Sequence, residues 1–132
     1  MKREDFDLLR HAMYVVPWVS YEDGEFYDTT GDKKKIWDPK NDDRDSFRLA
    51  VWLGIVAEVA KDRNRAIASH PTYGFERSEV KIVTWGYYSE ATVLEISAAA
   101  TRLAILNVAT GVGRAKKEND KRCGLAMRKG CP

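Results

Sequence analysis

Hydrophobic residues recur at helical spacing in three stretches of the chain, residues 3–12, 42–53 and 98–112. In the first stretch, Phe6, Leu9 and Met13 would share one face of a short helix. Between the helical stretches lie segments that are rich in β-branched and aromatic residues or that alternate between polar and apolar positions, which is typical of strands. These predicted strands cover residues 13–21, 25–28, 55–60, 65–69 and 79–85.

The predicted order is therefore helix, hairpin, helix, hairpin, strand, helix. Antiparallel hairpins combined with separate helices predict an α+β fold instead of a parallel doubly wound sheet. We expect a single domain in which helices pack on a small antiparallel sheet. Asp23-Gly24 supplies the tight turn of the first hairpin.

The stretch from Trp37 to Ile55 contains the strongest local signals. Pro39 favours an extended or turn conformation just before a helix, and Asn41 or Asp42 can cap that helix at its start. Gly54 can adopt the left-handed conformation that ends it. The face of this helix that we expect to pack on the sheet contains the following residues: Phe47, Ala50, Val51 and Gly54, with Leu49 and Leu53 beside it.

The last predicted helix begins after a Ser97 cap and continues to about Val112, with Gly111 and Gly113 as its end. Ile105, Ala109 and Val112 would share a face with Arg102. From residue 114 onward the chain has a net charge of +5, whereas residues 1–113 have a net charge of −3. We therefore expect a folded domain over 1–113 and a basic, mobile tail over 114–132, with weak contact to nucleic acid through that tail as the alternative.

Composition narrows the class of protein further. Among 132 residues, 44% are hydrophobic and 32% charged, and the net charge of +2 is too small to argue for a nucleic-acid-binding protein. No run of fifteen apolar residues occurs and the start lacks a signal-like apolar core, so we expect no membrane span and a cytoplasmic location. Cys123 and Cys131 are then interpreted as reduced thiols, with a short-range disulfide or a shared metal site left open.

Two blocks of sequence resemble a known family. The first contains Trp37-Asp38-Pro39, Asp42-Asp43, Asp45, Arg48-Leu49-Ala50 and Leu53-Gly54-Ile55, and the second contains Ala99 to Ile105 and Gly111 to Arg114. In these blocks the chain resembles the phage-encoded proteins described by an αβα-sandwich domain and related to the NinX-like proteins. It departs from them at Arg44, where a glycine is common, and in the aromatic insertion from His70 to Tyr88. The resemblance implies a phage accessory protein inside an infected bacterial cell, with no established activity.

Candidate catalytic groups are few. The four carboxylates of the central helix start (Asp38, Asp42, Asp43 and Asp45) could bind a cation, but their spacing favours helix capping and surface charge. The histidines His11 and His70 have no accompanying nucleophile motif. The sequence therefore predicts no catalytic residue, no metal ligand and no cofactor, and it favours a binding protein over an enzyme.

The best candidate for recognition is an aromatic segment that also contains basic residues. It comprises Tyr73, Phe75, Arg77, Lys81, Trp85, Tyr87 and Tyr88. Aromatic rings stack on bases and arginine pairs with phosphate, so these residues suit a nucleotide-like ligand; the alternative is that they form core or interface. Trp18 and Trp52 are interpreted as packing residues.

The resulting hypothesis is a phage-encoded, non-enzymatic binding protein that sequesters a nucleotide-type host defence signal. Because such pockets often form between subunits, we expect a homo-oligomer. The alternative is a phage accessory protein-interaction module in which the same aromatic residues bind a host protein.

Overall fold

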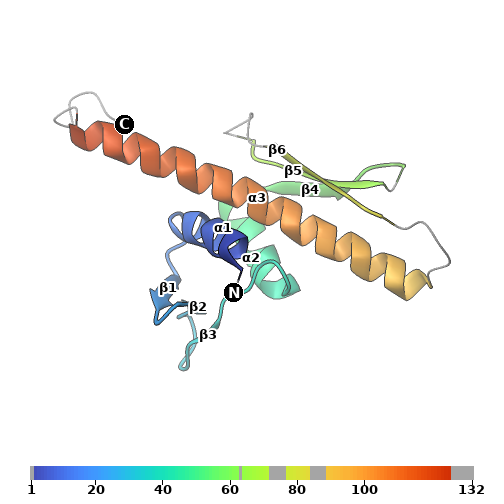
Figure 1. Cartoon of the computed structure of the whole chain (residues 1–132), viewed down its shortest axis with the longest axis horizontal. Helices are drawn as coiled ribbons and strands as arrows, with labels where there is room; N and C mark the ends of the chain where they lie inside the picture. Colours follow the sequence, from blue (N-terminus) through green and yellow to red (C-terminus); the bar gives the residue numbers. More distant parts are fainter. Residues whose placement is uncertain (1, 63, 72–76, 84–88, 126–132) are drawn as a thin grey trace.

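The structure is a computed structural model that describes residues 2–62, 64–71, 77–83 and 89–125, with side chains through Arg122. Its elements follow the predicted order except for the short strand β3, which was not predicted, and they confirm an α+β fold with antiparallel hairpins (Figure 1). They are α1 (Arg3–Met13), β1 (Val19–Glu22), β2 (Glu25–Asp28), β3 (Lys35–Ile36), α2 (Asp43–Leu53), β4 (Val56–Val59), β5 (Arg65–Ser69), β6 (Arg77–Lys81) and α3 (Glu90–Leu125).

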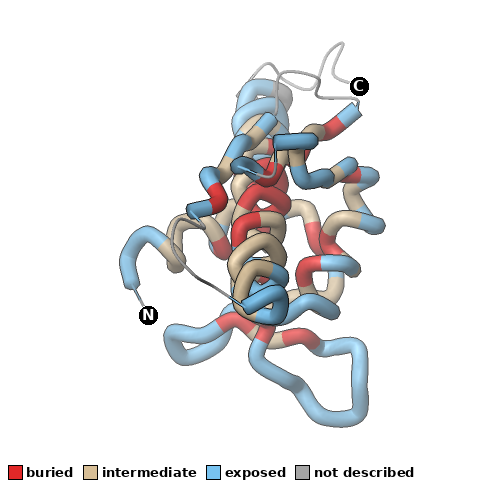
Figure 2. Tube along the Cα trace, turned by 90° about the vertical axis from the view of Figure 1, so that its right-hand side faces the viewer, coloured by how far each residue is buried: buried red, intermediate tan, exposed pale blue. Residues whose placement is uncertain are grey.

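Helix α3 contacts α1, α2 and all three strands of the second sheet. Its 36 residues give it a length of about 54 Å. The sheet β4-β5-β6 packs on one side of α3, while α1 and α2 pack elsewhere along it (Figure 1). Buried residues concentrate in the middle of α3, between these layers (Figure 2).

The first sheet, β1-β2-β3, is antiparallel throughout. Asp23 and Gly24 both have positive φ, 49° and 84°, as a two-residue hairpin turn requires, so the predicted Asp-Gly turn is confirmed. The predicted strand over 13–21 is wrong in its first half, because α1 continues to Met13 and turns follow it. Pro17 lies in this turn region, where its missing N–H costs no ladder hydrogen bond.

The second sheet, β4-β5-β6, places small residues against α3. Ala66 and Ala68 are fully buried on the face that also includes Ala57 and Val80, so the helix can approach the strands closely. The third strand starts at Arg77 and ends at Lys81, earlier in the chain than the predicted span of 79–85.

Helix α2 has the predicted ends but not the predicted buried face. Asp42 caps it by accepting a hydrogen bond from the Asp45 backbone N–H, and Gly54 ends it with φ of 73°. Its buried residues are Ser46 and Leu49, whereas Phe47 and Val51 are 69% and 64% exposed. The prediction that Phe47 and Val51 pack on the sheet is therefore wrong, because α2 packs on α3 through the neighbouring side of the helix.

Helix α3 is far longer than predicted at both ends. It begins at Glu90, ahead of the predicted Ser97 cap, and continues through Gly111 and Gly113 to Leu125. Gly113 does not end the helix. It allows α1 to pack closely on α3, because a Cβ at this position would overlap the carbonyl oxygen of His11 in α1. The predicted boundary between residues 113 and 114 thus lies inside α3, while the predicted buried face of Ile105, Ala109 and Val112 is confirmed.

Candidate functional site

The predicted aromatic segment can be followed in the structure only at its basic residues. Tyr73, Phe75, Trp85, Tyr87 and Tyr88 lie outside the described residues. The two basic residues are described, and both lie on the exposed side of β6.

Arg77 and Lys81 lie at the two ends of β6, on either side of Glu79 along the exposed face of the strand. Arg77 forms an ion pair with Glu79 at 2.9 Å, and Arg65 on β5 reaches the same carboxylate at 3.3 Å. Glu79 therefore already offsets part of the positive charge of this face. The grouping of Arg77 and Lys81 with the aromatic residues stays a prediction.

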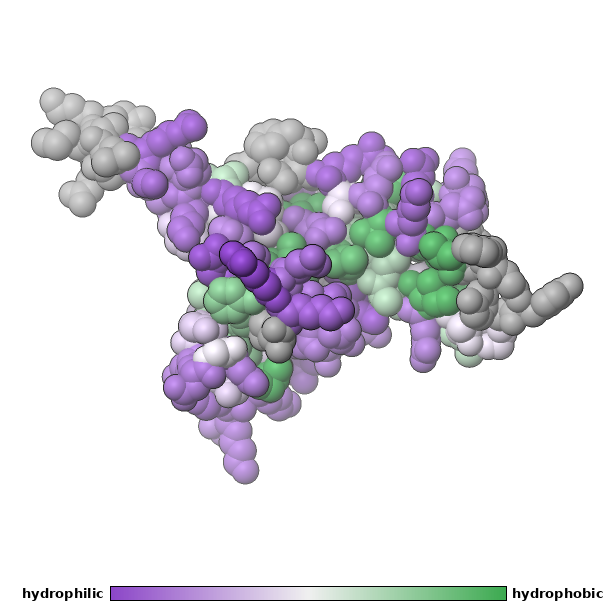
Figure 3. Space-filling model, viewed as in Figure 1, coloured by the Kyte–Doolittle hydropathy of each residue, from purple (hydrophilic) through white to green (hydrophobic). Residues whose placement is uncertain are grey.

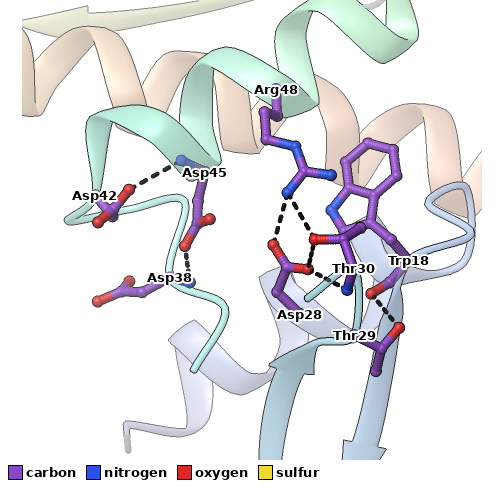
Figure 4. A network of polar contacts seen from close by, with 8 residues as sticks. All are labelled: Trp18, Asp28, Thr29, Thr30, Asp38, Asp42, Asp45 and Arg48. Atoms are coloured by element: carbon purple, nitrogen blue, oxygen red, sulfur yellow. Dashed lines mark hydrogen bonds and ion pairs between the residues drawn. The ribbon is translucent and has the colours of Figure 1, made fainter. Parts of the chain in front are cut away.

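The acidic start of α2 is occupied by structural hydrogen bonds (Figure 4). Asp42 caps the helix, and Asp45 accepts a hydrogen bond from the Asp38 backbone N–H at 2.9 Å. Burial raises the pKa of Asp45, and the negative charges of Asp42, Asp28 and Asp38 raise it further. The hydrogen bond from the Asp38 backbone acts in the opposite direction and lowers this pKa, but it does not outweigh them. In the part of the chain that the structure describes, no group of three or more His, Cys, Asp or Glu side chains is arranged to hold a metal ion.

Arg48 connects α2 to the first sheet. Its guanidinium donates a hydrogen bond to Asp28 at 2.7 Å and lies 4.6 Å from the centre of the Trp18 ring (Figure 4). Burial of Asp28 opposes ionisation, but hydrogen bonds from Thr30 and the charge of Arg48 outweigh it and lower the pKa of Asp28. These contacts make the cluster a structural clamp, with the carboxylate held ionised against the arginine.

A concave surface that the sequence did not predict lies where α1 leads into β1, beside the end of α2 and the C-terminal half of α3. We call it the aromatic–basic pocket. It has a volume of about 510 Å³, and the residues that matter here are Tyr14, Pro17, Trp52, His70 and Lys116. Volumes of this size are usual for small-ligand sites.

The two rings of this pocket are accessible yet fixed in position. Tyr14 is 41% and Trp52 55% exposed. The Tyr14 hydroxyl donates to Asp120 at 2.7 Å, and the Trp52 indole N–H donates to the Val15 carbonyl at 2.9 Å. Trp52 also packs edge to face on Trp18, so it contributes to packing as predicted while leaving part of its surface free.

Positive charge gathers at this end of the molecule. Lys116 lies in the pocket wall. Burial lowers the pKa of the nearby His11, and the charges of Arg114, Arg10 and Lys117 lower it further. Asp7 and Asp120 offset part of this charge, and the remaining cations would attract an anionic group that entered the pocket.

A second concave surface, the apolar groove, lies between α2, β4 and α3. Its volume is about 690 Å³, and its main apolar residues are Phe47, Val51, Ala57, Val59, Leu94 and Ile105. Ser46, 2% exposed, lines the same groove, and its hydroxyl makes no hydrogen bond within the described residues. Arg102 is the cation in the wall, but it already donates to the Lys40 carbonyl at 2.9 Å and pairs with the Asp43 carboxylate.

Hydrophobic side chains continue from this groove along the N-terminal half of α3, toward the right of Figure 3. Leu94 in this segment is 71% exposed. By length and composition alone, α3 could cross a membrane. An 18-residue window within it has a mean hydropathy of 1.3, and 28% of that window is buried. Core helices of soluble proteins meet the same criteria. What is established is that the apolar part of α3 is incompletely covered.

The elements and the two concave surfaces define a protein of the α+β class. The chain matches no family model, no curated protein and no solved structure. The resemblance of residues 37–55 and 99–114 to the phage sandwich family therefore stays a prediction. The residues of the aromatic–basic pocket come from four separate segments, so no spacing in the sequence indicated that they would meet.

Proposed function

We propose that the protein is a non-enzymatic binding protein and that the aromatic–basic pocket binds a small, anionic, aromatic ligand of the nucleotide type. The observation that supports this most directly is the pairing of two accessible rings, Tyr14 and Trp52, with Lys116 in one cavity of about 510 Å³. In the setting that the family resemblance implies, an infected bacterial cell, such a protein would sequester a nucleotide-type host signal.

The chemistry of the pocket matches the two parts of a nucleotide. A base can stack on an indole or phenol ring, an interaction of about 1–3 kcal/mol per base. A phosphate can accept a charge-assisted hydrogen bond from Lys116, and the neighbouring cations of α1 and α3 would attract it. The pocket offers stacking rings and positive charge, and both suit the binding of a nucleotide.

The apolar groove is less suited to such a ligand. Its walls are apolar, and Arg102 is engaged by Asp43 and by a backbone carbonyl. A phosphate there would have to displace an existing ion pair. The groove and the pocket therefore suit different kinds of partner.

The proposal is tested by isothermal titration of AMP, ADP-ribose and a cyclic dinucleotide into the purified protein. Lys116→Gln removes one charge from the pocket and should weaken binding about 10-fold. Lys121→Gln is the matched control, because Lys121 is an exposed residue farther along α3 that lies neither in the pocket wall nor among the cations acting on His11. It should weaken binding less than about 2-fold.

Three results would contradict this proposal. One is the absence of heat with all three nucleotides. Another is an equal loss of affinity in both lysine variants, which would indicate non-specific attraction. The third is a loss of affinity in Arg77→Gln or Lys81→Gln but not in Lys116→Gln, which would assign the ligand to the aromatic segment predicted from the sequence.

A further inference from the structure

The apolar groove leaves an unusual amount of hydrophobic surface in contact with water. Phe47, Val51 and Leu94 are each more than 60% exposed, and Val59 is 40% exposed. They belong to three different elements, α2, α3 and β4, yet they line one groove or its continuation. Single exposed apolar residues are normal in soluble proteins, whereas a continuous patch of this kind marks an interaction surface.

We propose that a second copy of this chain covers the apolar groove, and that the protein is a dimer with two-fold symmetry through α2, β4 and the N-terminal third of α3. The inference is independent of the proposed ligand, because none of the groove residues named here lines the aromatic–basic pocket.

The patch is large enough to form the apolar centre of a dimer interface. The exposed parts of Phe47, Val51, Val59 and Leu94 surround one groove, an apolar patch on the order of a few hundred Å² per copy. A standard protein interface buries about 800 Å² per partner, of which somewhat more than half is apolar. The groove and its continuation would supply a substantial share of that apolar area.

The shape of this face allows it to pair with itself. The groove is concave, while the N-terminal third of α3 extends beyond α2 as a ridge that bears the exposed Leu94 (Figure 1). A two-fold axis brings the same patch of both subunits together, so the ridge of each copy can enter the groove of the other. Leu94 also lines the groove, so the groove and this part of α3 are adjacent.

The charges around the patch are compatible with a second copy. Lys61 and Glu90 both line the continuation of the groove, and Glu95 is exposed on the ridge. A rim with both signs can form ion pairs across a two-fold axis, whereas a rim of one sign would repel itself.

The test is sedimentation velocity and light scattering of the full chain at micromolar concentration, where we expect twice the monomer mass. Phe47→Glu and Leu94→Glu lie on two different elements, and each should raise the dimer dissociation constant at least about 30-fold. Ile36→Glu is the matched control, because Ile36 is also exposed, at 53%, but lies outside the groove on β3. It should leave the dimer unchanged.

Circular dichroism of each variant checks that the monomers remain folded, and Phe47→Leu should retain the dimer. A wild-type chain that stays monomeric would overturn the inference, as would dimers that persist in both glutamate variants. A monomer that sediments with phosphatidylglycerol vesicles, or one that binds a host protein through Phe47, would also overturn it and assign the groove to that other occupant. Nucleotide binding is also measured in Phe47→Glu, in which the aromatic–basic pocket is unchanged. Failure of the dimer inference and failure of the proposed function can then be told apart.

Discussion

The two helices that pack on α3 differ in how much apolar surface their contact with α3 buries. Where α1 crosses it, the contact is so close that Gly113 has no room for a Cβ, and Ala109, Thr110 and Val112 are buried around it. Where α2 meets it, only one side of α2 is covered, and Phe47 and Val51 face a groove of about 690 Å³. Both regions are apolar in sequence, yet only the first is covered within the chain. An apolar helix face therefore indicates a contact surface, but it does not tell whether the contact is made by the same chain.

The largest effect should come from filling the space between α1 and α3. Gly113→Ala places a methyl group against the His11 backbone, and a backbone atom cannot move aside as a flexible side chain can. The helices must separate, and we expect the free energy of unfolding to fall by at least about 3 kcal/mol. Urea denaturation followed by circular dichroism measures this change.

Gly54→Ala is the comparison for that variant. Gly54 has φ of 73°, and a Cβ at this position would have no neighbour within 4 Å, so only the left-handed backbone opposes the substitution. We expect a cost of about 1 kcal/mol. If Gly113→Ala were no worse than Gly54→Ala, the close packing of α1 on α3 would be incorrect.

The next effect separates the two sides of α2. Leu49 is fully buried, and Leu49→Ala should cost about 3 kcal/mol of stability through lost contacts and the cavity that remains. Phe47→Ala, two residues away, should change the stability of the monomer by no more than about 0.5 kcal/mol. Both are measured by thermal and urea unfolding at concentrations where the chain is monomeric.

This pair of variants also bears on the dimer. At concentrations that favour association, Phe47→Ala should lose stability relative to the wild type, while the cost of Leu49→Ala should not depend on concentration in the same way. Equal costs for both variants in the monomer would mean that Phe47 is buried and that the groove is closed.

Local chemistry explains the parts of the fold that could be predicted from the sequence. The Asp42 cap, the Gly54 helix end and the Asp23-Gly24 turn each depend on neighbouring residues alone, and all three are confirmed. The same local reasoning predicts a helix end at Gly113, and there it is wrong. The role of Gly113 depends on α1, which lies about a hundred residues away in sequence, so no local pattern could reveal it.

The candidate sites were harder to predict because they depend on which elements meet. The apolar face of α2 is evident in the sequence, but whether it packs on a sheet or faces a groove depends on where α3 lies. The aromatic–basic pocket brings together Tyr14, Trp52, His70 and Lys116 from four segments. Trp52 could be interpreted from the sequence only as a packing residue, which describes one side of its ring.

A further prediction concerns the clamp that holds α2 to the first sheet. This clamp orients the helix that forms one wall of the groove. Asp28→Asn keeps the shape of the side chain but removes its charge, so the hydrogen bond and ion pair with Arg48 weaken. We expect a loss of about 1–2 kcal/mol at neutral pH. Asp32→Asn, at an exposed position in the following loop, is the control and should change stability by less than about 0.5 kcal/mol.

The pH dependence of this effect follows from the lowered pKa of Asp28 in the folded protein, relative to an ordinary value of 3.8. A carboxyl group with a lowered folded-state pKa contributes its full stability above the unfolded-state value and loses it as the pH falls through the folded-state value. The difference between wild type and Asp28→Asn should therefore be constant from pH 7 to 5 and shrink below about pH 4. Urea unfolding at pH 7, 5 and 3 measures it, and a difference that stayed constant down to pH 3 would show that the charge of Asp28 does not stabilise the clamp.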